Sequence, residues 1–201
     1  MSTQLRADAQ RNLERVLDSA AALFAERGCD VSVDEIARRA GVGHATVFRR
    51  FPTKDALIAA VVSKQIRELV ALVESELEEK DAGEAFRAFV WHAGERYSRD
   101  RALYDGFSRC VGLPEVAEAK AELDGLVGQL IERAQEAGAV RPDIAPDDVS
   151  ALVGSAIHGA AESPDRELWR RYVEVVLDGL RPPVERSTAS RRGRQSAPTT
   201  F

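Results

Sequence analysis

The apolar residues of this chain recur with the period of an α-helix along almost its whole length. In the first segment Leu13, Val16, Leu17, Ala20 and Phe24 are spaced so that they form one stripe on a helix. Alternating β-branched runs joined by hairpin turns, which would predict strands, do not occur. The pattern therefore predicts an all-α protein of about nine helices.

Glycines and capping residues mark the breaks between the expected helices. Gly28 is a C-terminal cap candidate for the first helix, and Gly41 ends a short second helix. Ser32 and Glu35 have the spacing of a capping box at the start of that second helix. The later helices are expected at about 44–51, 54–79 (with Thr53 as its N-terminal cap), 84–98, 101–111, 114–137, 146–161 and 165–180.

Composition and charge divide the chain into three parts. We expect a first domain at 1–55, a second helical domain at 56–181, and a disordered basic tail at 182–201. The net charge of the whole chain is -5, which taken alone argues against nucleic-acid binding. The distribution is uneven, because residues 1–55 carry +1, residues 56–180 carry -10 and residues 181–201 carry +4. The acidic excess therefore belongs to the second domain.

Several function classes lack support in the sequence. The longest uncharged apolar stretch, 56–62, is far shorter than the roughly 20 residues of a membrane-spanning helix. Residues 1–15 contain no apolar signal core. We therefore expect a cytoplasmic protein without membrane contact, with Cys29 and Cys110 as packed thiols. Clustered acid–base or metal-binding motifs do not occur, so we expect no catalytic residue, no metal and no cofactor.

Residues 32–51 have the spacing of a helix-turn-helix. Ala37 is small enough for two helices to cross closely, Gly41 tolerates the positive φ of the turn, and Val47 and Phe51 would return the second helix to the core. The outward face of that helix carries imidazole, hydroxyl and guanidinium groups, which suit the major groove and its flanking phosphates. A helical hairpin with a solvated cationic face has the same pattern and remains an alternative.

The residues at 32–37, 40–42 and 46–57 resemble the DNA-binding domain of the TetR family of transcriptional regulators. The resemblance is dense over about 10–62, and the remainder is similar only in layout to that family's ligand-binding and dimerisation domain, with a general likeness to the SbtR-like branch. It implies phosphate contacts from the second helix, the recognition helix and the start of the long helix. The implied DNA-contacting residues are Ser32, His44, Ala45, Thr46, Phe48, Arg49, Arg50 and Lys54. Arg38 and Arg39 are open candidates.

Three positions depart from the family's pattern. Phe48 stands where tyrosine is common, so a phenolic contact to phosphate is lost. Arg50 stands where histidine is common and can replace that contact with a charged one. Gly43 stands where serine often caps the recognition helix. Two alternatives stay open: Phe48 packs either on the core or on the DNA, and His44 either contacts a base or is only solvated.

Aromatic residues are concentrated in the second domain. Six of the chain's twelve fall within 86–107, which favours an apolar pocket with a few polar groups. The resemblance implies a small-molecule cavity among these helices, and plain core packing is the alternative for each aromatic residue. The candidate ligand-binding residues are Phe86, Trp91, Tyr97, Tyr104, Phe107 and His158. His92, His158 and Cys110 are further candidates as polar or metal-binding members.

The last two expected helices have the composition of a dimer interface. Small residues in 146–161 allow close helix approach, and 165–180 carries a run of large apolar side chains. Symmetric pairing would give a four-helix interface. The candidate interface residues are Leu152, Ala156, Trp169, Tyr172, Val173 and Val176. A dimer would place two recognition helices about 34–36 Å apart, on a near-palindromic operator.

These features together predict a homodimeric repressor that binds double-stranded operator DNA and is released by an unknown small-molecule effector. The ligand would favour a spacing of the recognition helices that no longer fits successive grooves. The long helix would couple the two domains. Two other classes stay open, an all-helical enzyme or ligand carrier and a protein-interaction bundle, and activation in place of repression is compatible with the same sequence.

Overall fold

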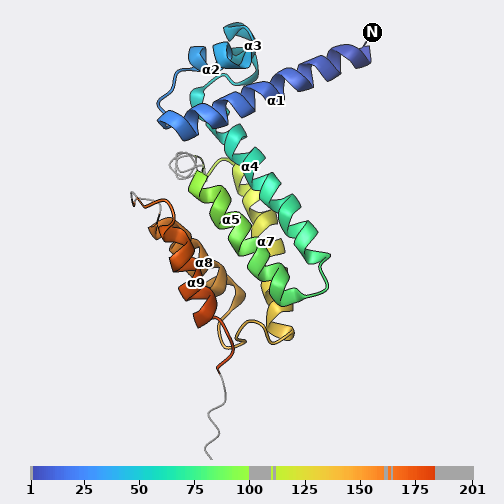
Figure 1. The fold of residues 1–201 in the computed structure, drawn as a ribbon. Helices are drawn as coiled ribbons and strands as arrows, with labels where there is room; N and C mark the ends of the chain where they lie inside the picture. Colours follow the sequence, from blue (N-terminus) through green and yellow to red (C-terminus); the bar gives the residue numbers. More distant parts are fainter. Residues whose placement is uncertain (1, 100–109, 111, 161–162, 164, 184–201) are drawn as a thin grey trace, which may run out of the picture.

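The computed structural model describes residues 2–99, 110, 112–160, 163 and 165–183. Within these ranges all regular secondary structure is α-helical, which confirms the predicted fold class (Figure 1). The helices are α1 Ser2–Arg27, α2 Val33–Ala40, α3 His44–Arg50, α4 Lys54–Leu77, α5 Ala82–Arg99, α7 Pro114–Glu136, α8 Pro146–Gly159 and α9 Leu168–Gly179. The expected helix at 101–111 and the expected tail lie almost wholly outside the described residues. No described helix combines the length and apolar character needed to cross a bilayer.

The ends of two helices follow capping interactions that the sequence indicates. Gly28 adopts a φ of 80°, and its N–H donates to the carbonyl of Phe24 at 2.8 Å, so α1 ends where predicted. The hydroxyl of Thr53 accepts a hydrogen bond from the N–H of Ala56 at 3.0 Å and caps α4. This cap fixes the residue at which α4 begins, and therefore the position of Lys54.

Helix α9 begins at Leu168, later than the predicted 165. The hydroxyl of Ser163 accepts from the N–H of Asp165 at 3.1 Å, and the carboxylate of Asp165 accepts from the N–H of Glu167 at 3.0 Å. Short side chains that bind nearby N–H groups offer the backbone an alternative to helix. These two hydrogen bonds therefore hold the preceding residues in turns and delay the start of the helix.

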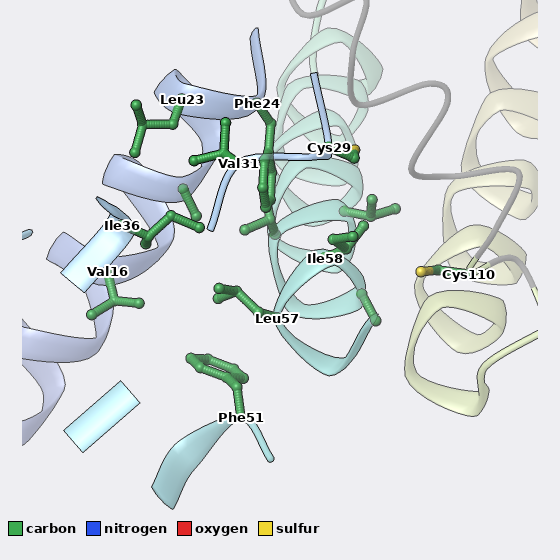
Figure 2. Close-up of a cluster of buried hydrophobic side chains, with 14 of the residues drawn as sticks. Val16, Leu23, Phe24, Cys29, Val31, Ile36, Phe51, Leu57, Ile58 and Cys110 are labelled. Atoms are coloured by element: carbon green, nitrogen blue, oxygen red, sulfur yellow. The ribbon is translucent and has the colours of Figure 1, made fainter. Parts of the chain in front are cut away.

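The first hydrophobic core joins α1, α2 and α3 to the first turns of α4 (Figure 2). Phe24, Ile36, Val47 and Leu57, one from each of these helices, are no more than 1% exposed. The same core takes in Cys110 and residues from the first turns of α7. Residues from the start of α7 thus join the same core as the helix-turn-helix, and α4 is the helix that α7 packs against.

A second core lies between α5, α7, α8 and α9, and it includes Val90, Leu130 and Val173. Val73, near the end of α4, belongs to this core as well. Helix α4 runs from the first core along α5 and α7 (Figure 1) and so contributes to both. Leu123 of α7 packs against both cores. The two domains therefore share a continuous apolar connection.

At Gly94, the backbone of α5 lies in close contact with a side chain of α9, that of Trp169. A Cβ atom at this position would lie 2.3 Å from Cζ3 of Trp169, a separation that real contacts do not allow. Trp169 is 3% exposed, and its ring packs edge-on against Trp91 with centroids 5.5 Å apart. The glycine is required because the indole occupies the space of its missing side chain.

We expect Gly94→Ala to lower the free energy of unfolding by roughly 1–3 kcal/mol, because the new methyl group overpacks the contact with Trp169. Urea denaturation of the purified protein measures this. Gly125→Ala is the matched control, since a Cβ there meets nothing within 4 Å and alanine raises helix propensity by up to about 1 kcal/mol. Equal stability of the two variants would contradict the assigned contact.

Candidate nucleic-acid interface

A capping box positions the start of α2. The hydroxyl of Ser32 accepts from the N–H of Glu35 at 3.3 Å, and the N–H of Ser32 donates to the carboxylate of Glu35 at 3.3 Å. The predicted capping box is therefore confirmed. Arg27, the last residue of α1, donates to the same carboxylate at 2.7 Å. The hydrogen bonds from Arg27 and then from Ser32 lower the pKa of Glu35 from its ordinary 4.5 to about 2.

The turn of the helix-turn-helix depends on Gly41. Its φ is 65°, the left-handed conformation that the sequence predicted for this position. The N–H of Val42 donates to the carbonyl of Ala37 at 3.0 Å and closes the end of α2. Arg15 of α1 donates to the carbonyl of Gly41 at 3.2 Å. The turn is therefore held from α1 and from α2, which fixes the direction in which α3 leaves it.

Helix α3 buries one side and exposes the other. Val47 is 1% exposed and Phe51, at the C-terminal cap, is also buried, as the helix-turn-helix pattern predicted. The exposed side carries the predicted recognition residues, namely His44, Ala45, Thr46, Phe48, Arg49 and Arg50. Phe48 is 47% exposed, so its ring lies on the surface rather than in the core. Of the two alternatives for Phe48, the structure excludes core packing.

His44 is held by two neighbours. Its ring stacks on the ring of Phe48 with centroids 4.9 Å apart and planes 27° apart. Its Nδ1 atom contacts the carboxylate of Asp34, in the first turn of α2. Because Nδ1 contacts Asp34, Nε2 is the ring nitrogen that faces away from this contact. Asp34 is not among the predicted site residues, because its only signal in the sequence is its place between Ser32 and Glu35 in the cap.

The basic residues of this region fall into two groups. Arg39 makes a two-pronged ion pair with Glu26, both contacts at 2.8 Å, and this hydrogen bonding raises the pKa of Arg39 and lowers that of Glu26. Within the part of the chain that the structure describes, no carboxylate pairs with Arg49, Arg50 or Lys54. Arg39 is thus paired with a carboxylate of its own chain, whereas Arg49, Arg50 and Lys54 are available to an external anion. Arg38 is also exposed and has no ion pair among the described residues.

The remaining predicted contacts lie at two helix starts. Ser32 is exposed at the N-terminal cap of α2. Lys54 is half-buried and is the first residue of α4, next to the cap formed by Thr53. Backbone N–H groups at such helix starts favour a bound anion. The eight residues predicted to contact DNA are therefore all at the surface or partly exposed.

A cavity of about 340 Å³ lies between α4, α5, α7 and α8. Tyr97 and His158, two of the predicted ligand-binding residues, line it. Their rings are 4.5 Å apart, and Nδ1 of His158 donates to the carbonyl of Gly154 at 2.6 Å. The rest of the lining is mainly aliphatic, and much of it comes from α4 and α7, outside the aromatic-rich stretch at 86–107 that predicted the pocket.

The other predicted ligand-binding residues lie elsewhere. Phe86 is buried in the second core and borders a separate cavity of about 200 Å³ near the end of α9. Trp91 packs against Trp169 and does not line the larger cavity. Tyr104 and Phe107 lie outside the described residues. For Phe86 and Trp91, core packing is therefore the role that the structure supports.

The candidates for polar or metal-binding roles are also separated. His92 is exposed and lies 3.5 Å from Glu76, whereas Cys110 is buried with its Sγ atom 3.8 Å from the carbonyl of Asp55. In the described ranges no three His, Cys, Asp or Glu side chains converge as they would around a metal ion. His158 alone among these candidates reaches the 340 Å³ cavity.

Helices α8 and α9 leave apolar side chains on the surface. Leu152 and Tyr172 of the predicted interface are exposed, and Val175, which the prediction omitted, is 72% exposed. Trp169 and Val173 are buried within the same chain instead, because both belong to the second core, where Trp169 packs against α5. Ala156 is also buried, and Val176 is half-buried.

An exposed recognition helix with unpaired cations, joined through α4 to a helical domain with a cavity, defines a DNA-binding regulator of the helix-turn-helix class. Residues 16–61 match the family described as "Bacterial regulatory proteins, tetR family". Residues 81–182 match the family described as "Transcriptional regulator SbtR-like, C-terminal domain". The chain belongs to the TetR family of transcriptional regulators, as the resemblance predicted.

Individual relatives are regulators as well. The chain is 39% identical over 95 residues to the HTH-type transcriptional repressor Rv3405c of Mycobacterium tuberculosis, and this alignment covers 46% of each chain, less than half of the relative's length. A TetR regulatory protein from Mycobacterium vanbaalenii is 38% identical with a TM-score of 0.68, over 88% of this chain and 99% of that one. The TetR regulator SCO0520 from Streptomyces coelicolor is 30% identical with a TM-score of 0.68, over 86% and 99%.

We expect Glu35→Gln to lower stability at pH 7, because it removes the carboxylate that Arg27 and Ser32 hold in its ionised form. The folded-state pKa lies below the ordinary value of 4.5, so this stabilisation is complete above pH 4.5 and is lost as the pH falls toward about 2. Urea midpoints measured between pH 7 and pH 3 should therefore converge for the two proteins. Glu122→Gln, on the exposed face of α7, is the control for loss of one negative charge. A constant difference across this range would contradict the assignment.

Proposed function

We propose that the protein is a ligand-released repressor that binds a near-palindromic operator as a homodimer. The observation that carries the proposal is the exposed face of α3, where Arg49 and Arg50, together with Lys54, have no acidic partner among the described residues. Such groups bind phosphates and release condensed counterions. The M. tuberculosis relative is named a repressor, and this supports repression, rather than activation, as the direction of regulation.

The exposed apolar side chains of α8 and α9 support a homodimer. Leu152, Tyr172 and Val175 lie on the surface of two helices that pack against one another. Apolar side chains gathered on a surface mark an interaction site. A second copy that presents the same face would bury them in a symmetric four-helix contact. Such a dimer would set two recognition helices about 34–36 Å apart, the separation of successive major grooves.

The 340 Å³ cavity is the proposed effector site, and α4 and α7 connect it to the DNA-facing end. Helix α4 begins at Lys54 and lines the cavity with Ile66 and Leu69. Leu123 of α7 lines the same cavity and packs against both hydrophobic cores. A ligand that fits one arrangement of these helices better than another shifts the population toward it. The release of DNA follows when that arrangement no longer fits successive grooves.

Mobility shift on genomic fragments recovered by pull-down, at about 50 mM salt, tests the DNA-binding part of this proposal. We expect at least one fragment to bind more tightly than bulk DNA and to contain a near-palindrome. Sedimentation of the free protein tests the homodimer, and a reporter fused to the recovered promoter tests repression. A monomer in sedimentation, or increased reporter expression in the presence of the protein, would contradict the corresponding part.

We expect Lys54→Ala to weaken binding to all DNA sequences about equally and to flatten the salt dependence of log K by about one. The reason is that a lysine at a helix start contacts phosphate, which carries no sequence information. Fluorescence anisotropy with operator and random duplexes over a series of salt concentrations measures both quantities. Lys80→Ala, an exposed lysine after the far end of α4, is the control. A loss confined to the operator would overturn the phosphate role.

We expect His44→Ala to change the preferred base at one or two operator positions, and Asp34→Ala to produce a weaker change at the same positions. Asp34 holds Nδ1 of His44, so its removal frees the ring to rotate without deleting the base contact. Selection of binding sites from a randomised pool measures the preference. Asp34→Asn keeps an oxygen acceptor and should therefore retain the base preference of the unsubstituted protein. Asp30→Ala is the control for the loss of one negative charge. Identical selected sites for all variants would refute both roles.

A further inference from the structure

We infer that the effector of this protein is an uncharged, mainly apolar small molecule that binds in the cavity between α4, α5, α7 and α8. The inference rests on the proposed ligand response and adds the chemical class of the ligand. The volume of about 340 Å³ lies near the lower end of the roughly 300–1,000 Å³ typical of small-molecule sites. The cavity therefore suits a compact ligand.

Each helix that forms the cavity contributes apolar side chains to its wall. Ile66 and Leu69 come from α4, Phe89 from α5, Val127 from α7 and Ile157 from α8. Burial of an apolar ligand against such a surface is favourable, whereas each polar group of the ligand has to find a hydrogen-bond partner there. The lining therefore favours a ligand with a large apolar body and few polar groups.

The charged groups around the cavity are already paired with one another. Arg96 of α5 binds Glu68 of α4, and Lys120 of α7 binds Asp124 one turn further along the same helix. Arg96, Lys120 and Asp124 line the cavity, and with Glu68, the partner of Arg96, the four charges sum to zero. A charged ligand would lose hydration without gaining an available counter-ion. An uncharged ligand avoids this loss.

One polar group on the ligand is compatible with the end of the cavity at Tyr97 and His158. Nδ1 of His158 donates to the carbonyl of Gly154 at 2.6 Å. In the neutral imidazole the other nitrogen, Nε2, is then an acceptor. This end of the cavity is therefore polar, which is compatible with a single polar group on the ligand.

Three probes with the same alkyl chain and different head groups test the inference: decanol, decanoate and decyltrimethylammonium. We expect isothermal titration calorimetry on the full chain without DNA to show decanol binding at least about tenfold more tightly than either ionic probe. Equal or tighter binding of an ionic probe, or no binding of decanol, would overturn the inference.

Two pairs of variants locate the binding site. Ala93→Phe places a ring in the cavity and should abolish decanol binding, whereas Ala71→Phe, on the exposed face of α4, should not. Asp124→Asn, at an exposed site, frees Lys120 and should strengthen decanoate binding several-fold relative to decanol binding. Glu122→Gln, outside the cavity on the same helix, should change neither. An Asp124→Asn protein with unaltered decanoate affinity would overturn the charge argument even if Ala93→Phe does not fold.

Release of DNA is measured separately, by anisotropy of a labelled operator during titration with decanol. Decanol that binds the free protein but leaves the operator bound would refute ligand release and leave the ligand class standing. A protein that binds the operator but does not bind decanol would refute the ligand class alone. The two failures are therefore distinguishable.

Discussion

The packing of α4 against α7 is the interaction on which the rest of the structure depends. Leu57 places the start of α4 in the core of the helix-turn-helix, and Val73 places its end in the core of the second domain. Helix α7 runs beside it and contributes to the same two cores, with Leu123 at their junction. The position of the helix-turn-helix relative to the cavity is therefore set by one continuous apolar contact.

Electrostatics at the DNA-facing end depend on which charges are paired inside the protein. Glu26 and Glu35 bind Arg39 and Arg27 and brace α2 against α1. Arg49 and Arg50 have no such partner among the described residues, although they lie in a region whose net charge is only +1. The overall charge of -5 arises from the second domain and is a poor guide to what the other end binds.

Much of the N-terminal domain was predictable because the capping hydrogen bonds and turn conformations that define its helices are local. Gly28, Gly41, the capping box at Ser32 and the cap at Thr53 act within one helical turn, and each has its predicted role in the structure. The cavity was less predictable. A concentration of aromatic residues indicated where a pocket would form, but Phe86 and Trp91 fill the core, and aliphatic residues of α4, α7 and α8 form much of the wall. Periodicity tells which side of a helix faces inward, not which partner it meets.

The sequence by itself determined the all-α class, the capped helix starts, the turn at Gly41 and the outward face of α3, because hydrogen bonds and side-chain spacing within a few residues fix each of them. The tertiary structure decided which residues share a surface. It placed Asp34 against His44, and it put Trp169 into the space above Gly94 rather than on a dimer face. These outcomes depend on contacts between helices far apart in the chain, where volume and crossing geometry choose the neighbour.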